Sequence, residues 1–213
     1  MVALTFDDGP DAEATPAVLE ALKAVNVKAT FFVVAEQVEE AEGPALLRAI
    51  MDDGHAIQAH CGRHNSHRDQ TGEQIANDVH GILAALERNG VPDPCLWRPP
   101  YGLTNDQFSC SIAAAVGLQL VLWTHDTADY ADRSPEEMLH AAENAPLYED
   151  SVILMHDSAR YAHERDECQA TVDLIPRLVD HLRHCGHGLG ALTAPIAARA
   201  LLPGELPLLP CSQ

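Results

Sequence analysis

Short apolar runs alternate with amphipathic stretches along most of the chain. Six of the runs are rich in β-branched, aliphatic and aromatic residues and are bounded by turn residues, which is typical of buried strands. These predicted strands cover residues 2–6, 29–34, 56–60, 96–100, 118–123 and 151–156. The stretches between them have helical periodicity and about the length that a crossover helix needs. The pattern therefore predicts an α/β fold whose parallel sheet is either doubly wound or closed into a barrel.

Helix boundary signals mark several of the amphipathic stretches. Residues 71–74 (TGEQ) and 134–137 (SPEE) have the spacing of capping boxes, and Pro16 suits the first position of a helix. Residues 170–186 place apolar side chains at helical spacing and cations late in the segment, and Pro176 could kink this helix. These signals support the alternation of strands and helices.

We expect the 213 residues to form one domain. The motifs described below lie within residues 5–156. A C-terminal helix and strand are predicted within residues 170–195, followed by a tail over residues 196–213.

The charge of the chain limits its partners. There are 32 acidic and 13 basic residues, giving a formal net charge of −19, which argues against nucleic acid and against an anionic membrane surface. A neutral or weakly cationic ligand fits better, and no run approaches the ~20 apolar residues of a membrane span. Because Met1 leads straight into the first strand, the sequence as written predicts a cytoplasmic protein. A secreted or cell-envelope protein is the alternative if a leader precedes it, and the oligomeric state is left open.

The six cysteines do not form a CxxC pair, which argues against a zinc ribbon and against a thioredoxin-like site. In a chain of this length an even number does not imply a disulfide framework. We expect mostly buried free thiols and leave open a pairing among Cys168, Cys185 and Cys211.

Polar side chains gather where the predicted strands end. They are Asp7, Asp8, His60, Arg98, Asp126 and His156. A barrel brings all carboxyl-terminal strand ends onto one face, whereas an open sheet spreads them along an edge, so a barrel is favoured. Asp7 and Asp8 are adjacent, and adjacent strand residues point to opposite faces. The two carboxylates are therefore expected to have different roles.

Histidines follow the third predicted strand at a spacing that suits a metal. His60 and His64 are four residues apart, and two histidines with one carboxylate make a divalent metal site with positions open to water. A solvated histidine-rich loop is an equally good interpretation of this stretch alone. We expect His55 and His67 to be bystanders, although His67 could line the cleft.

Three later segments carry weaker signals. Arg98 precedes two prolines, so it could be held rigidly against a carboxylate or simply pair with the acidic surface. Asp126 and Asp129 are three residues apart after another strand. His156 closes a nearly apolar strand, where a core histidine is common, but carboxylates are available to pair with it.

Taken together, the segments TFDDGP, HxxxH, RPPY, DxxDY and LxH, in this order from Thr5 to His156, resemble the five motifs of the polysaccharide deacetylases. This family is also called carbohydrate esterase family four, or the NodB-homology domain. The resemblance implies a distorted, incomplete (β/α) barrel of about seven parallel strands. It also implies a metal-dependent hydrolase of non-peptide carbon–nitrogen bonds that releases acetate from an N-acetylated, or O-acetylated, sugar. Chitin oligomers, peptidoglycan and acetylxylan are the family's ordinary substrates.

The resemblance assigns the base and the metal ligands. Asp7 matches the general base, and Asp8, His60 and His64 match the three metal ligands. Arg98 matches the arginine that holds the base. Zinc is the favoured metal, and cobalt, nickel or manganese are alternatives.

The resemblance also assigns the acid and the pocket wall. His156 matches the general acid, and Asp129 matches its supporting carboxylate. Tyr101 matches the residue whose backbone N–H faces the oxyanion, and Leu154 matches an apolar wall. Asp126 is expected near the motif arginine.

Three positions depart from the family pattern. Cys61 stands where the family usually has Ser or Thr, and we expect a small buried side chain there, with a fourth metal contact as the alternative. Tyr130 replaces the usual Trp and changes one wall of the acetyl pocket. Asn65 stands where the family more often has Pro, so the loop after the second histidine is expected to differ.

Two other functions stay open. One is an intracellular amide hydrolase, a deacetylase or deformylase, for a small metabolite or biosynthetic intermediate. The other, less favoured, is a sugar-binding domain without turnover. Such a relative would be expected to have lost Asp7 or His156, and both are present.

Overall fold

A computed structural model describes residues 1–192 of the chain, and one parallel sheet runs through it. Its seven strands are β1 (Ala3–Asp7), β2 (Thr30–Val34), β3 (Ala56–Cys61), β4 (Leu96–Trp97), β5 (Gln119–Leu120), β6 (His125–Asp126) and β7 (Val152–His156). Their order across the sheet is β5-β4-β3-β2-β1-β7-β6. The first strand of the chain therefore lies inside the sheet, between β2 and β7.

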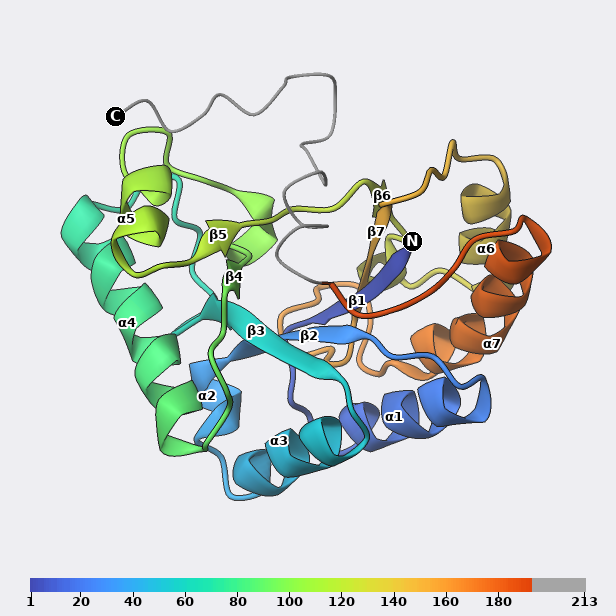
Figure 1. Cartoon of the computed structure of the whole chain (residues 1–213), viewed down its shortest axis with the longest axis horizontal. Helices are drawn as coiled ribbons and strands as arrows, with labels where there is room; N and C mark the ends of the chain where they lie inside the picture. The colour runs from blue at the N-terminus through green and yellow to red at the C-terminus, as the bar shows by residue number, and fades with distance from the viewer. Residues whose placement is uncertain (193–213) are drawn as a thin grey trace.

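Helices surround the sheet on its outer side (Figure 1). They are α1 (Ala14–Ala24), α2 (Ala35–Val38), α3 (Gly43–Asp52), α4 (Gly72–Arg88), α5 (Ser109–Ala115), α6 (Pro135–Glu143) and α7 (Gln169–His184), with 3₁₀ turns η1 (Pro100–Gly102) and η2 (Asp129–Ala131). Both predicted capping boxes are present, at Thr71 and at Ser134. Along the part of the chain that the structure describes, no helix has the length and apolar character needed to cross a membrane.

The sheet is curled into an incomplete barrel. β5 and β6 form opposite edges of the sheet, yet only four residues separate Leu120 from His125 along the chain. Five extended residue steps reach at most ~18 Å, so the two edges must lie near each other. This connection confirms the predicted distorted, incomplete (β/α) barrel and is incompatible with an open doubly wound sheet.

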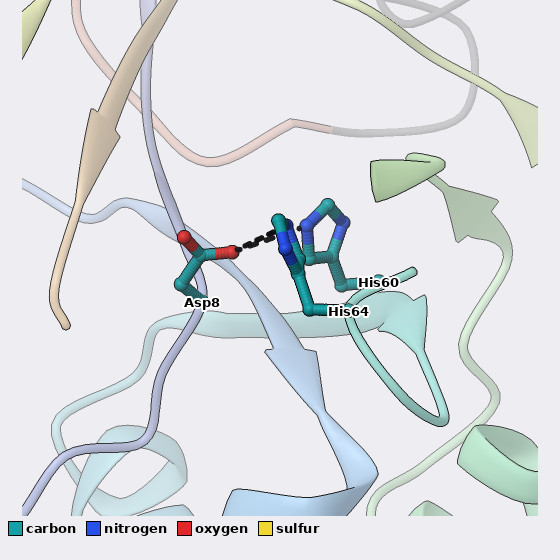
Figure 2. Close-up of side chains that lie close together, drawn as sticks. All are labelled: Asp8, His60 and His64. Carbon is teal, nitrogen blue, oxygen red and sulfur yellow. Dashed lines mark ion pairs between the residues drawn. The ribbon is translucent and has the colours of Figure 1, made fainter. Parts of the chain in front are cut away.

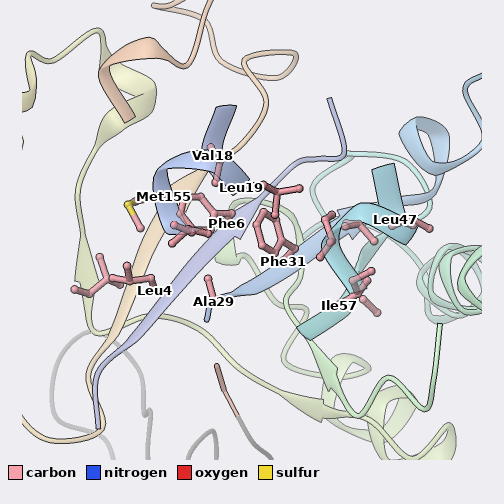
Figure 3. Close-up of a cluster of buried hydrophobic side chains, with 14 of the residues drawn as sticks. Leu4, Phe6, Val18, Leu19, Ala29, Phe31, Leu47, Ile57 and Met155 are labelled. Atoms are coloured by element: carbon pink, nitrogen blue, oxygen red, sulfur yellow. The ribbon is translucent and has the colours of Figure 1, made fainter. Parts of the chain in front are cut away.

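Apolar side chains cover both faces of the sheet. On the outer face, Phe6 and Phe31 stack with ring centroids 5.2 Å apart and pack with Val18 and Leu19 of α1 (Figure 3). The smaller inner cluster consists of Ala3, Phe32, Leu96, Val121, Val152 and Leu192. The barrel interior is therefore filled with side chains, and an active site can form only at its open end.

Some predicted boundaries were wrong. The strands expected over 96–100 and 118–123 are two-residue strands, and β6 was not predicted. Pro99 and Pro100 lack the N–H that a longer β4 would need. Helix α1 begins at Ala14, before Pro16, and α7 continues through Pro176.

Part of the segment predicted to follow the last helix lies within the described residues. There Leu189 makes an isolated parallel bridge to Val2, where we expected a strand reaching as far as residue 195. The predicted tail over 196–213 lies outside the described residues, as does Cys211. Cys168 and Cys185 carry free thiols.

Candidate active site and metal centre

A cavity of about 350 Å³ opens where the carboxyl ends of the central strands meet. The predicted residues that line it are Asp7, Asp8, His60, His64, Tyr101, Asp126, Tyr130, Leu154 and His156. Arg98 and Asp129 lie behind this lining and contact it through Asp7 and His156, respectively. The structure thus brings all the predicted site residues into one cluster.

Asp8 and the two histidines form a compact ligand group (Figure 2). Asp8 Oδ1 lies 3.3 Å from His60 Nε2 and 3.2 Å from His64 Nε2. Asp8 has a φ of 78°, so the chain leaves β1 in a turn, and a Cβ on Gly9 would collide with the carboxylate of Asp157. Because this turn leaves no room for a side chain at position 9, glycine must follow the two aspartates.

The protonation of His60 shows that this group fits a cation. His60 Nδ1 lies 2.6 Å from the carbonyl oxygen of Arg98, which can only accept, so Nδ1 carries a proton and Nε2 is the nitrogen that faces Asp8. Asp8 Oδ1 is buried and has no well-aligned donor among the described residues. Burial raises the pKa of the Asp8 carboxyl, but the two imidazoles outweigh burial and hold that pKa well below its ordinary value. A carboxylate that faces two imidazole nitrogens is a donor set for a divalent metal.

Asp7 points to a different partner from Asp8. Its Oδ1 accepts a hydrogen bond of 2.6 Å from Arg98 Nη1, which also donates to Thr5 Oγ1 at 2.9 Å. Arg98 is fully buried, donates through Nη2 to the carbonyl of Leu122, and stacks over the ring of Phe32. Burial lowers the pKa of Arg98, and the charge of Asp7 opposes this effect. The fixed guanidinium holds the Asp7 carboxylate in place at the cavity.

His156 lies beside Asp7 because β1 and β7 are paired in register, Asp7 opposite His156. His156 Nδ1 is 2.7 Å from Asp129 Oδ1, and the His156 backbone N–H donates to Asp129 Oδ2 at 2.9 Å. Burial lowers the pKa of His156, but the charge of Asp129 outweighs burial and raises that pKa to about 9. The imidazole is therefore protonated at neutral pH and can donate a proton.

Two residues that sequence reasoning missed complete the surroundings of Asp129. Thr171 Oγ1 donates to Asp129 Oδ2 at 2.7 Å, and Arg165 Nη1 lies 3.4 Å from the same oxygen. Arg165 also donates to Thr171 Oγ1 at 2.6 Å. Thr171 was assigned only to a helix, and nothing in the spacing of Arg165 in the sequence marks it as a site residue.

Aromatic residues form the cavity walls. Tyr101 is half exposed with a φ of 58°, and a Cβ on Gly102 would lie 2.6 Å from the ring of Trp123, so only glycine fits there. Tyr130 packs edge-on against His156 with ring centroids 5.7 Å apart, and its hydroxyl lies 3.5 Å from Asp126. The segment after β7 adds a wall that we did not predict, formed by Ser158, Tyr161, Ala162, His163 and Glu164.

A comparison with known families identifies this constellation. A family model described as polysaccharide deacetylase matches residues 1–121. The chain belongs to the polysaccharide deacetylase family. Members of this family are metal-dependent, and Asp8, His60 and His64 form the candidate metal site of this one.

Individual members of the polysaccharide deacetylase family match most of the chain. A peptidoglycan-N-acetylglucosamine deacetylase of Bacillus cereus is 32% identical over 190 residues, which cover 88% of this chain and 84% of that protein. A family 4 carbohydrate esterase from Streptomyces lividans, solved in complex with acetate, superposes with a TM-score of 0.78 at 30% identity and covers 95% of this chain and 97% of that one. A family 4 acetyl xylan esterase from Clostridium thermocellum, solved with a cobalt ion, has a TM-score of 0.77 at 27% identity, covering 89% and 87%.

Some curated polysaccharide deacetylases are much longer than this chain. The peptidoglycan-N-acetylglucosamine deacetylase PgdA of Listeria monocytogenes is 34% identical over 160 residues, which are 73% of this chain. The match covers only 32% of the length of PgdA.

Three other residues considered from the sequence, His55, His67 and Cys61, are not part of the ligand group. His55 Nδ1 accepts the backbone N–H of Ala29 at 3.0 Å. His67 is fully buried, with Nε2 3.1 Å from Asp78, and does not line the cavity. Cys61 is buried at the end of β3 and is not part of the ligand group. These placements agree with the expectation of bystander histidines and a small buried cysteine.

Proposed function

We propose that this chain is a metal-dependent deacetylase that hydrolyses the N-acetyl group of a sugar and releases acetate. One observation carries the proposal. Asp7, held by the buried Arg98, and His156, held by the buried Asp129, line the same cavity as the ligand group of Asp8, His60 and His64. Amide hydrolysis needs these parts, namely a base for water and an acid for the leaving amine.

The residues divide the proton transfers between them. Asp7, held in position by Arg98, accepts the proton of the water that attacks the acetyl carbon. The backbone N–H of Tyr101 donates to the developing oxyanion. His156, kept cationic by Asp129, gives its proton to the departing amine, which would otherwise be a poor leaving group. Zinc held by Asp8, His60 and His64 would supply Lewis acidity and a more acidic water.

The substrate we propose is an N-acetylated glycan, such as a chitin oligomer or the glycan strand of peptidoglycan. Two properties of this chain support it: a net charge of −19 disfavours polyanions, and aromatic walls at Tyr101, Trp123 and Tyr130 suit the apolar face of a sugar ring. The name of the Bacillus cereus relative points to peptidoglycan, and the name of the Clostridium thermocellum esterase points to acetylated xylan.

A panel assay tests the reaction and the substrate together. Acetate release is measured from chitin oligomers, peptidoglycan fragments, acetylxylan and small N-acetyl metabolites, with wild type and D7N side by side. We expect turnover on a glycan that D7N abolishes while it still binds zinc. Acetate or formate release confined to small metabolites would favour the alternative amide hydrolase. Zinc binding without turnover on any substrate would favour a sugar-binding domain.

A further inference from the structure

The two histidines of the ligand group are held in different ways. His60 Nδ1 is fixed by the carbonyl of Arg98, as is usual for a metal-binding histidine. His64 Nδ1 is buried and has no hydrogen-bond partner among residues 1–192. A metal-binding imidazole without such a bond can rotate about its Cβ–Cγ bond unless packing prevents it.

Packing on His64 comes from two tyrosines. The ring of Tyr161 stacks on the ring of His64 with centroids 4.4 Å apart and an interplanar angle of 15°. The ring of Tyr101 meets it edge-on, with centroids 4.5 Å apart at 65°. A stacked and an edge-on contact together fix the plane of the imidazole, in which Nε2 lies 3.2 Å from Asp8 Oδ1.

The turn that carries Tyr161 is itself anchored to the ligand group. Gln37 is buried and donates through Nε2 both to the backbone carbonyl of Asp8 and to Ser158 Oγ, the latter at 3.2 Å. Ser158 Oγ in turn accepts the backbone N–H of Arg160 at 3.2 Å, and Arg160 forms an ion pair with Glu40. One amide side chain therefore ties a metal ligand to the turn that presents the stacking ring.

We propose that Tyr161 is a positioning residue for the metal, whose stacked ring orients His64 in place of a hydrogen bond to Nδ1. This inference rests on the metal site of the proposed function. It also accounts for Asn65, which stands where the family more often has Pro: the loop itself is less constrained, and a ring from another segment fixes the histidine. A bound cation withdraws electrons from the imidazole and strengthens its stack on the electron-rich phenol ring. By linkage, the stack strengthens metal binding by the same factor.

Zinc affinity of the apoprotein tests this role. Dissociation constants are measured by competition with a chelator for wild type, Y161A, Y161F and Y148A, and apoprotein melting temperatures are recorded alongside. We expect Y161A to bind zinc about tenfold more weakly, as for loss of other ligand-orienting partners. Y161F keeps the ring, and Y148A removes an exposed tyrosine elsewhere, so both should match wild type.

Equal affinities for Y161A and wild type would overturn the inference, and so would an equal loss in Y161F, since that would assign the effect to the hydroxyl. If Y161A does not fold, Y161L fills the space without a π face, and it is expected to show the same loss. D8A separates this inference from the proposed function. If wild type and D8A bind zinc equally, the proposed metal site is wrong. If D8A loses zinc affinity and Y161A does not, only the positioning role of Tyr161 is refuted.

Discussion

The cavity contains two buried pairings of carboxylate and histidine that differ in what surrounds the carboxylate. Asp8 faces His60 and His64, and its Oδ1 has no well-aligned donor within residues 1–192. Asp129 faces the imidazole of His156 through Oδ1, and its Oδ2 accepts from both the His156 backbone N–H and the hydroxyl of Thr171. Aspartate and histidine thus form a candidate metal site in one pairing, whereas in the other pairing the aspartate keeps the imidazole protonated.

The difference shows that the neighbours of a carboxylate decide its chemistry. Asp129 is supplied with donors on every side, including Arg165, so its charge is stabilised and it keeps a proton on His156. Burial raises the pKa of Asp8, and only the surrounding imidazoles hold it low, so a bound metal would supply the remaining neutralisation of its charge. Removing members of each pairing tests this contrast.

Removing the carboxylate of the metal group should have the largest effect. We expect D8A to lose zinc and all measurable deacetylation, because two histidines alone leave the site a ligand short. Metal content by atomic spectroscopy, together with acetate release, checks this. Stoichiometric zinc in D8A would show that Asp8 is not a ligand.

Removing the acid should spare the metal. We expect H156A to bind zinc like wild type and to lose about 10²- to 10⁴-fold in kcat, the usual contribution of one acid–base group. Single-turnover kinetics on the best glycan measures the loss. A substrate with a good leaving group, such as an activated acetyl ester, should recover most of the rate, and failure to recover would argue against the acid role.

Neutralising the partner of His156 should change the pH profile more than the structure. In wild type, activity that needs cationic His156 falls as pH rises through about 9. We expect D129N to move this alkaline limb to lower pH, since the charge that raises the pKa is lost. The stability that this raised pKa contributes is full below the ordinary histidine value of 6.5 and is lost as pH rises through about 9. Chemical denaturation between pH 6 and 10 should show this slope in wild type and not in D129N.

The smallest effect is expected at Arg165. R165M removes a cation beside Asp129, so we expect about a tenfold loss in kcat from looser positioning, with KM unchanged. Loss of a nearby cation favours a protonated imidazole, so the alkaline limb should stay at or above its wild-type pH. A shift to lower pH, as in D129N, would show that Arg165 does not act on Asp129 as the structure implies.

The sequence predicted the parts of this site that short spacing encodes. The TFDDGP segment ends a strand in a turn, and Asp7 and Asp8 have different partners, as expected, although Asp8 lies in the turn beyond β1 and not on the strand. The capping boxes at Thr71 and Ser134 are equally local signals and were predicted correctly.

What the sequence could not predict depends on contacts between distant segments. Arg165 and Tyr161 follow β7 without any characteristic spacing, and their contacts with Asp129 and His64 exist only once the barrel has closed. The edge strands are two residues long, too short to produce a periodic pattern, so β6 was missed and β5 was overextended.

The register of β1 against β7 has a consequence for the synthesis of the protein. Among the strands of this sheet β1 is synthesised first, but its pairing with β7 places Asp7 opposite His156, which is made much later. Until then one edge of β1 has no partner, and contacts this distant in sequence form slowly. Chains that stop before residue 150 should therefore expose an apolar strand edge and be removed by chaperones and proteases. The proposed acid and base therefore become neighbours only when β7 pairs with β1.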